Sequence, residues 1–277
     1  MPWHVWGATI NTVHSEDDFA VWLSSDRRRG AAVVADGVSA TSGGGASFLA
    51  AQGFIQACRS MLRGSPPSLL AVTRRCFDYT ASMASDSIVV DADVIELVKK
   101  RYYTECSSGG KPCTQPLTLE YLIEKRPVPA AGHVEREAPP STTVMATVLG
   151  DETLGLVMAG DGYILGASPL KDETWLLWGA LPQLFEGSRL SRFIELGRGS
   201  VGKPLFLEMS PVPGMVYVIS SDGVDAAALA EVLTGMLQEN PVIIRYENPA
   251  VEILTKVRAK MGGFEDDATI VVVTYYE

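Results

Sequence analysis

The sequence contains no segment typical of a membrane or secreted protein. No apolar run reaches 18 residues, the length at which a segment becomes a candidate transmembrane helix. Residues 1–13 contain neither the basic segment nor the apolar segment that together mark a signal peptide. We therefore expect a cytoplasmic protein that has no membrane partner.

Cysteine and histidine are scarce. The chain has four cysteines and three histidines, with no Cys-x-x-Cys pair, so it offers no plausible zinc-binding set. Cys58 and Cys76 fall in helical patterns, which indicates small buried side chains. Cys106 and Cys113 flank a Ser-Ser-Gly-Gly loop. They either close a loop disulfide or stay free thiols, the usual state in a reducing compartment.

Basic residues are outnumbered by acidic ones. The chain has 23 Lys and Arg against 33 Asp and Glu, a formal net charge of −10. Because nucleic-acid binding needs basic surface, this balance argues against nucleic acid as the main partner. The charge would also repel an anionic substrate unless a cation offset it locally. The length of 277 residues and the apolar share of 47% are ordinary for a folded globular chain.

Strand and helix patterns lie on both sides of one irregular stretch. Residues 85–140 contain several prolines, and we interpret them as an insertion within one domain because strand signals resume directly afterwards. Residues 168–210 are expected to form a long irregular segment over a site. The expected strands are 5–13, 18–24, 31–35, 142–149, 155–159, 163–167, 215–221 and 268–274. The expected helices are 45–63, 65–83, 225–238 and 249–261, with further helical pieces near 91–104 and 117–125 inside the insertion.

Acidic residues stand at the ends of three expected strands. Asp36-Gly37 follows a short apolar run, Asp222-Gly223 follows a second, and residues 265–267 precede a third. A carboxylate at the mouth of a buried strand needs a partner or a metal. If the three ends converge, they form an all-oxygen site of the kind that hard divalent cations prefer. Alternatively, Asp36 and Asp222 are turn residues that bind backbone amides.

Six short motifs occur in a characteristic order. They are an acidic pair before an aromatic, an Asp-Gly with a glycine-rich helix start, a Thr-Thr strand, a Gly-Asp turn, a second Asp-Gly, and an acidic strand start (residues 15–19, 34–47, 141–144, 160–163, 220–225 and 265–272). As an ordered set they resemble the metal-dependent (type 2C-like) protein serine/threonine phosphatases, and more closely their divergent prokaryotic branch. The resemblance implies an α/β (α+β) fold over residues 1–277, a four-layer α-β-β-α sandwich of two stacked antiparallel sheets flanked by helices.

The resemblance also implies a centre of two Mn²⁺ or Mg²⁺ ions. Positions that match direct metal ligands in the family are Asp36, Asp222 and Asp266, the expected catalytic set, joined by the carbonyl oxygen of Gly37. Two such ions lower the pKa of a bridging water, which then attacks phosphorus in line. Asp267 adjoins Asp266, so the ligand assignment could shift by one position.

Three further acidic residues match outer positions of that centre. Glu16 and Asp17 match residues that hold metal-bound waters in the family. Asp161 matches a ligand of an additional, weaker third metal, and its alternative role is that of a hairpin turn residue. The metal site predicted from this resemblance therefore draws its ligands from most of the chain.

Two positions depart from the family pattern. The arginine that grips the substrate phosphate is replaced by Thr12, and the histidine that often follows the first Asp-Gly is absent from residues 38–41. His14 either substitutes for one of these groups or has no role. The arginines at residues 27–29 are interpreted as a solvated hairpin tip, with phosphate binding as the alternative.

The resemblance implies a metal-dependent phosphatase of phosphoserine and phosphothreonine. Its substrates would be phosphorylated proteins made by a serine/threonine kinase, and the enzyme would act in signalling as a monomer. Two alternatives remain open at this stage. One is a pseudophosphatase, a binding or regulatory module that keeps the fold without turnover. The other is a phosphohydrolase of small phosphate esters.

Overall fold

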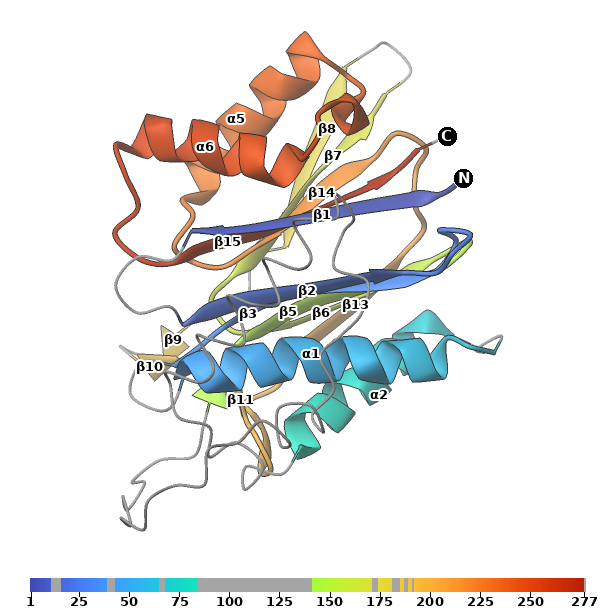
Figure 1. Ribbon diagram of the computed structural model, residues 1–277, viewed down its shortest axis with the longest axis vertical. Helices are drawn as coiled ribbons and strands as arrows, with labels where there is room; N and C mark the ends of the chain where they lie inside the picture. Colours follow the sequence, from blue (N-terminus) through green and yellow to red (C-terminus); the bar gives the residue numbers. More distant parts are fainter. Residues whose placement is uncertain are drawn as a thin grey trace.

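Two five-stranded antiparallel sheets stack face to face, and a pair of helices covers each outer face (Figure 1). The computed structural model describes residues 1–10, 16–38, 43–64, 68–83, 141–170, 174–180, 185–186, 189–190 and 192–276. This arrangement confirms the four-layer sandwich predicted from the motifs. The expected insertion at 85–140, with Cys106 and Cys113, lies outside the described residues, as do Thr12 and His14.

The first sheet joins the two ends of the described chain. Its strands, in spatial order, are β1 (Trp3–Ile10), β15 (Ala268–Tyr275), β14 (Val216–Ser220), β7 (Tyr163–Pro169) and β8 (Trp175–Ala180). β1 and β15 pair along their whole length, from Trp3 opposite Tyr275 to Ile10 opposite Ala268. The last strand of the chain therefore lies between the first strand and the rest of the sheet.

The second sheet is built mainly from hairpins. Its strands, in spatial order, are β13 (Leu205–Met209), β6 (Leu154–Ala159), β5 (Val144–Leu149), β3 (Gly30–Asp36) and β2 (Asp17–Leu23). β5 and β6 are buried at every position, because one face packs on the other sheet and one on helices. Such strands are almost continuously apolar, which explains why the sequence pattern located them.

Apolar side chains fill the space between the sheets. Members contributed by the first sheet include Trp3, Tyr217 and Val271, and members contributed by the second include Val34 and Leu156. One polar contact crosses this layer, between the hydroxyls of Thr147 and Tyr217, which are 2.9 Å apart. Each buried apolar side chain of this size contributes about 1.5–3 kcal/mol to holding the sheets together.

The side chains of Ser68, Asp225 and Asn248 each cap the start of a helix. α1 (Gly43–Met61) and α2 (Leu69–Ser82) cover the second sheet, whereas α5 (Ala226–Glu239) and α6 (Pro249–Met261) cover the first. The Asn248 side chain caps α6, whose first residue is proline, and Gly262 ends it in the left-handed conformation at φ 79°. Both features are strong local signals, which is why the span 249–261 is predicted correctly.

The expectation of a long irregular segment at 168–210 was wrong. The region contains β8 and β13, the outermost strands of the two sheets. It also contains the short strands β9 (Phe185–Glu186), β10 (Arg189–Leu190), β11 (Phe193–Glu195) and β12 (Gly199–Val201). β8 and β13 are only partly buried, so their sequences lack the continuous apolar run of a central strand. β11 also pairs with β4 (Ser141–Thr142).

No helix within the described ranges is both long and apolar enough to cross a bilayer.

Candidate metal centre

The acidic strand ends all fall at one end of the sandwich. β3 finishes at Asp36 and β2 begins at Asp17, and the two residues are directly opposite each other in the β2–β3 register. Asp222 follows β14, and Asp161 lies in the turn between β6 and β7. Asp266 comes just before β15. Because neighbouring strands run in opposite directions, residues from five parts of the chain lie together at one end of the sandwich.

Three of these carboxylates form a tight cluster. One oxygen each from Asp36, Asp161 and Asp222 lies within 4.8 Å of the others. Asp36 and Asp161 are partly buried, while Asp222 is exposed, so the cluster opens to solvent on one side. The Oδ1 atom of Asp161 is buried and makes no hydrogen bond. An acceptor-only oxygen in this position suits a cation better than it suits a structural turn.

The Thr-Thr strand holds the backbone of Asp36 in place. The Thr142 hydroxyl donates to the Asp36 carbonyl oxygen at 2.7 Å, and the Thr143 amide donates to the same oxygen at 2.7 Å. In return, the Asp36 amide donates to the Thr143 hydroxyl at 3.0 Å. These bonds occupy the main-chain groups of Asp36 and leave its carboxylate directed at the cluster. They explain why a Thr-Thr pair belongs to the site although neither side chain is a charged ligand.

Glycines allow the acidic turns to approach one another. Gly160, at φ 145°, has a backbone conformation that side chains rarely adopt, and a Cβ added there would lie 2.3 Å from the Cβ of Thr143. A Cβ added at Gly223 would lie 1.9 Å from the carbonyl oxygen of Asp267. Because that contact is with backbone, no side-chain rotation could relieve it. Gly160, next to Asp161, and Gly223, next to Asp222, are therefore packing requirements of the site.

Like charges dominate the electrostatics of the cluster. Burial, and then the neighbouring carboxylates of Asp17, Asp222 and Asp161, raise the pKa of Asp36 well above its ordinary value. Burial and the charge of Asp222 raise the pKa of Asp161 to about 6. Burial and the charge of Asp266 likewise raise the pKa of Asp222. Such a group of acids is stable only if protons or cations offset the charge.

Asp266 and Asp267 take different positions. Asp267 is 3% exposed, and its Oδ2 accepts from the amides of Glu16 at 2.6 Å and Asp17 at 3.4 Å. It therefore fixes the start of β2. Asp266 is exposed, and its charge raises the pKa values of Asp161 and Asp222. This division of roles favours Asp266 as the residue that faces the cluster, and its assignment as a ligand stays a prediction.

Ser221 is a contributor that the sequence did not single out. Its hydroxyl donates to the Oδ2 atom of Asp17 at 2.7 Å, and the Thr269 amide donates to the Ser221 hydroxyl at 3.0 Å. Burial raises the pKa of Asp17 to about 7, although the bond from Ser221 opposes that shift. The signal in the sequence was a serine directly before Asp-Gly, which alone is too common to assign.

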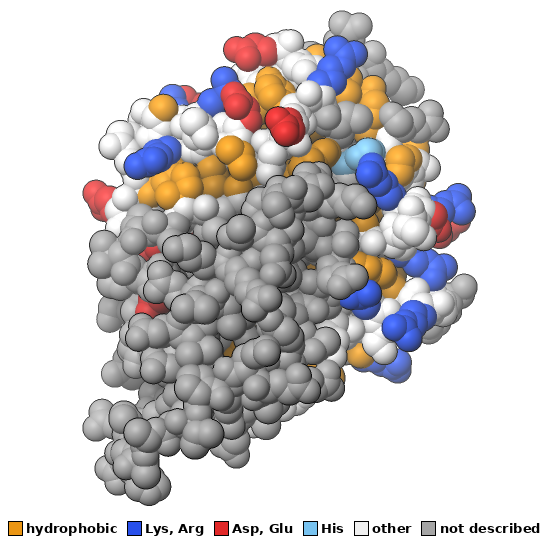
Figure 2. Space-filling view, viewed as in Figure 1, with side chains coloured by type: hydrophobic (Ala, Val, Ile, Leu, Met, Phe, Trp, Pro, Cys, Tyr) orange, Lys and Arg blue, Asp and Glu red, His pale blue; other side chains and the backbone are white. Residues whose placement is uncertain are grey.

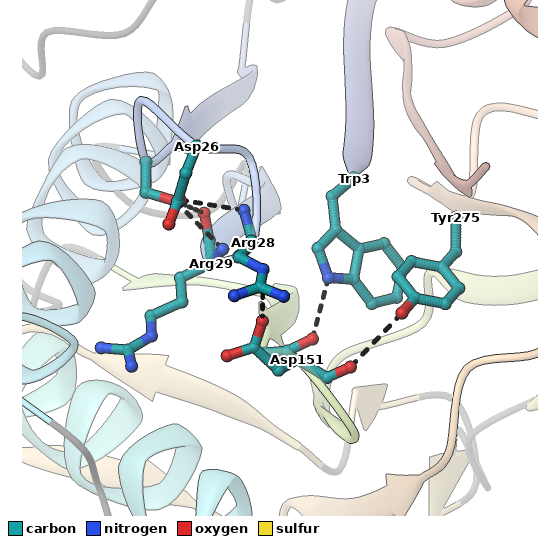
Figure 3. Close-up of polar contacts among 8 residues, drawn as sticks. Trp3, Asp26, Arg28, Arg29, Asp151 and Tyr275 are labelled. Carbon is teal, nitrogen blue, oxygen red and sulfur yellow. Dashed lines mark hydrogen bonds and ion pairs between the residues drawn. The ribbon is translucent and has the colours of Figure 1, made fainter. Parts of the chain in front are cut away.

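The arginines at residues 27–29 lie at the opposite end of the sandwich. They form the β2–β3 hairpin tip, where Arg28 pairs with Asp151 at 3.3 Å (Figure 3). Arg29 donates to the Leu62 carbonyl oxygen at 2.9 Å. Figure 2 shows Lys and Arg side chains gathered at this end, on the right of the view. This position is that of a hairpin tip and does not suit phosphate binding at the acidic cluster.

The donor set fits divalent metal. The described residues offer carboxylate oxygens from Asp36, Asp161 and Asp222 in one cluster, with an unbonded buried oxygen among them. Hard oxygen donors of this kind select Mg²⁺, Mn²⁺ or Ca²⁺ over softer ions. Asp17 lies opposite Asp36 in the β2–β3 pairing, and the Gly37 amide donates to the Glu16 carbonyl oxygen at 3.1 Å.

Solved structures resemble this chain across almost its full length. The sequence matches no family model and no curated protein. The catalytic domain of serine/threonine protein phosphatase PstP, solved with two manganese ions, superposes with a TM-score of 0.58 at 17% identity, covering 99% of both chains. Mycobacterium tuberculosis PstP/Ppp gives 0.60 at 17% identity, covering 100% of both chains.

A eukaryotic phosphatase matches in the same way. Serine-threonine phosphatase 2C from Toxoplasma gondii gives a TM-score of 0.56 at 14% identity, covering 96% of this chain and 93% of that one. Identities this low establish the fold alone. The fold predicted from six ordered motifs is thereby confirmed. The chain has the fold of the type 2C serine/threonine phosphatases, with a cluster of carboxylates at one end of its sandwich.

Proposed function

We propose that this protein is a metal-dependent phosphoprotein phosphatase that hydrolyses phosphoserine and phosphothreonine. The observation that carries the proposal is the meeting of Asp36, Asp161 and Asp222 within 4.8 Å at the end of a phosphatase-like sandwich. Two manganese ions in the similar PstP structure support the choice of metal. We propose Mn²⁺ or Mg²⁺ as the cofactor, with two ions and a weaker third.

Different acidic residues of the chain would bind different ions of the metal centre. Direct ligands would be Asp36, Asp222 and Asp266 with the Gly37 carbonyl oxygen, while Asp161 would bind the third ion. Divalent metal bound there would supply a water of lowered pKa as the nucleophile and would neutralise charge on the phosphoryl oxygens. No cysteine or serine is needed as a nucleophile in this scheme.

Residues behind the ligands would keep that geometry fixed. Thr142 and Thr143 hold the backbone of Asp36 by three hydrogen bonds. Asp267 holds the start of β2 through the amides of Glu16 and Asp17, whose carboxylates would bind water at the edge of the centre. Because orientation of the ligands decides metal affinity, loss of such contacts would cost about 10–100-fold in affinity or activity.

The proposed partner is a phosphorylated protein, the product of a serine/threonine kinase, taken by a cytoplasmic monomer. Nucleic acid and membrane are not proposed as partners, since the formal net charge of −10 disfavours anionic surfaces. An acidic protein that binds a phosphate group depends strongly on a cation at the site. Metal dependence of substrate binding is therefore part of the proposal.

A pseudophosphatase is the second candidate. Thr12 stands where the family places its phosphate-gripping arginine. Without that side chain, the metal alone would have to orient the phosphate. The chain would then bind a partner protein through its surface and turn over slowly or not at all.

The deciding experiment measures hydrolysis of a phosphothreonine peptide by metal-stripped protein with Mn²⁺, Mg²⁺ or neither. We expect activity only with metal, and its loss in Asp222→Ala. Asp151→Ala is the matched control, because it removes an exposed carboxylate at the opposite end of the sandwich. Metal binding without turnover would favour the pseudophosphatase. A preference for small phosphate esters over every phosphopeptide would instead indicate a phosphohydrolase of metabolites.

A further inference from the structure

Three sulfur atoms meet on the outer side of the second sheet, far along α1 from the acidic cluster. The Sγ atoms of Cys58, on α1, and Cys76, on α2, lie 2.9 Å apart. The Sδ atom of Met61 is 3.8 Å from the Sγ of Cys76. Both cysteines are free thiols with 0% exposure. The structure thus places two thiols in direct contact across a helix–helix interface.

The local sequence produces this contact. α1 ends at Met61 and α2 begins at Leu69, so a short connection folds the two helices back against each other. Cys58 and Cys76 are on the inward faces of their helices, packed in the same apolar cluster as Phe54, Phe77 and Leu62. Their small size lets the helices approach closely. The pairing depends on helix packing, so residue spacing alone did not predict it.

We propose that Cys58 and Cys76 are a dithiol pair that a two-electron oxidant converts into a disulfide between α1 and α2. The sulfur atoms need to approach by about 0.9 Å to reach the disulfide bond length of about 2.05 Å. With the azo reagent diamide as oxidant, both S–H bonds break and one S–S bond forms. The N=N bond of diamide takes up the two protons and two electrons and becomes a hydrazine.

The surroundings of the pair determine how the reaction proceeds. Both thiols are shielded from solvent by apolar side chains, and burial raises the pKa of the Cys58 thiol. Oxidation must therefore wait for a local opening of the α1–α2 pair, and we expect it to be slow. Once formed, the disulfide would close a loop across the helix connection and stabilise the layer that covers Asp36's sheet.

The test uses the full chain with Cys106→Ser and Cys113→Ser, so that only the proposed pair can react. Native protein is treated with diamide and then denatured for thiol titration and mass measurement. We expect both thiols to disappear, the mass to fall by two hydrogens, and dithiothreitol to reverse both changes. The midpoint of thermal unfolding should rise by about 5–10 °C on oxidation.

Single-cysteine variants provide the matched controls. In the same background, Cys58→Ala and Cys76→Ala should each keep one titratable thiol and show no rise in the unfolding midpoint. Peptide mapping of the oxidised, otherwise unaltered chain should find the Cys58 peptide joined to the Cys76 peptide. Thiols that persist in folded protein, while denatured protein oxidises readily, would overturn the proposal. A disulfide that lowers the unfolding midpoint would overturn it equally.

Discussion

The two ends of the sandwich are built from the same strands but differ in how their polar groups are paired. At the hairpin end, Trp3 donates its Nε1 hydrogen to the Gly150 carbonyl oxygen at 2.9 Å, and Tyr275 bonds the Asp151 carbonyl oxygen at 3.4 Å (Figure 3). These hydrogen bonds join the first sheet to the second and leave the polar groups involved paired. At the acidic end, the carboxylates of Asp36, Asp161 and Asp222 face one another. At the hairpin end these polar groups have partners within the protein, whereas at the acidic end the carboxylates need bound protons or cations to offset their charge.

This difference indicates where function and stability lie. Local conflicts such as clustered like charges persist in a folded protein when a ligand or reaction needs them. At the hairpin end, Arg27 and Arg28 are exposed to solvent and Arg28 pairs with Asp151, so we expect that end to contribute to stability. Changes at the acidic end should therefore alter metal response and activity, whereas changes at the hairpin end should alter stability without altering either.

The largest expected effect is that of Asp36→Asn. Because it changes a residue that we propose as a direct ligand, we expect metal-dependent hydrolysis to fall by more than about 100-fold. The metal-free fold should become more stable near neutral pH, because the raised pKa means that the Asp36 carboxylate must take up a proton on folding, and asparagine needs none. Activity assays and thermal unfolding with and without Mn²⁺ measure both effects. Full metal-dependent activity in this variant would refute the assignment of the centre.

A pair of glycine substitutions tests the close approach of the acidic turns. Gly223→Ala would place a Cβ 1.9 Å from the Asp267 carbonyl oxygen, so we expect it to displace Asp222 and to abolish the stabilisation by Mn²⁺. Gly235→Ala, in α5, meets no atom within 4 Å and should stabilise the protein by about 0.5–1 kcal/mol. Metal-induced shifts in the unfolding midpoint distinguish the two. Equal shifts in both variants would contradict the packing argument.

The response to metal should depend on pH. The pKa values of Asp161 and Asp17, about 6 and about 7, lie above the ordinary value of 3.8. The folded state holds these protons more tightly than the unfolded chain, so their stabilisation is complete below about pH 4. It is lost as the pH rises through 6 and 7. Metal replaces the protons, so the Mn²⁺-induced rise in unfolding midpoint should be larger at about pH 8 than at about pH 5.5. A shift independent of pH would show that these groups do not face the metal.

The smallest effects belong to the hairpin end. Trp3→Phe removes the donor to Gly150 and should cost about 1–3 kcal/mol of folding free energy, because Trp3 is 0% exposed. Arg28→Ala breaks a surface ion pair and should cost less than about 1 kcal/mol. Neither should change the activity of the folded fraction. Denaturant unfolding and activity per folded molecule check both, and a selective loss of turnover would show that the ends are coupled.

The sequence predicted that the acidic residues lie together, because the end of a strand can be recognised from the residues next to it. Apolar runs that stop at Asp36 and Asp222 show where strands end, and the ordered motifs indicate how those ends meet. The sequence did not reveal the hydrogen bonds that hold the acidic residues in place, because their partners are distant in the chain. The Ser221 bond to Asp17 spans 204 positions, and the Thr142 bond to Asp36 spans 106. Residue patterns carry no direct record of such pairs.

The edge strands β8 and β13 were also missed, whereas the other two edge strands, β1 and β2, were predicted. β8 was missed because Leu176 and Leu177 are 53% and 42% exposed and follow no alternation. Its place is determined by pairing with β7, whose residues Ile164 to Pro169 run opposite it. Local sequence predicted the central strands, the capped helices and the edge strands β1 and β2, which have no exposed position. The position of β8, which is partly exposed, is determined mainly by the neighbouring strand.

The pairing of β1 with β15 also constrains when the protein can assemble. Trp3 lies opposite Tyr275 and Ile10 opposite Ala268, so the paired residues of these two strands are 258 to 272 positions apart in the sequence. The hairpins of the second sheet can form early, but the first sheet must wait. Asp222 and Asp266 belong to that late-formed region. The acidic residues that we propose as ligands therefore come together only once this long-range pairing has formed, and metal binding would report that step of folding.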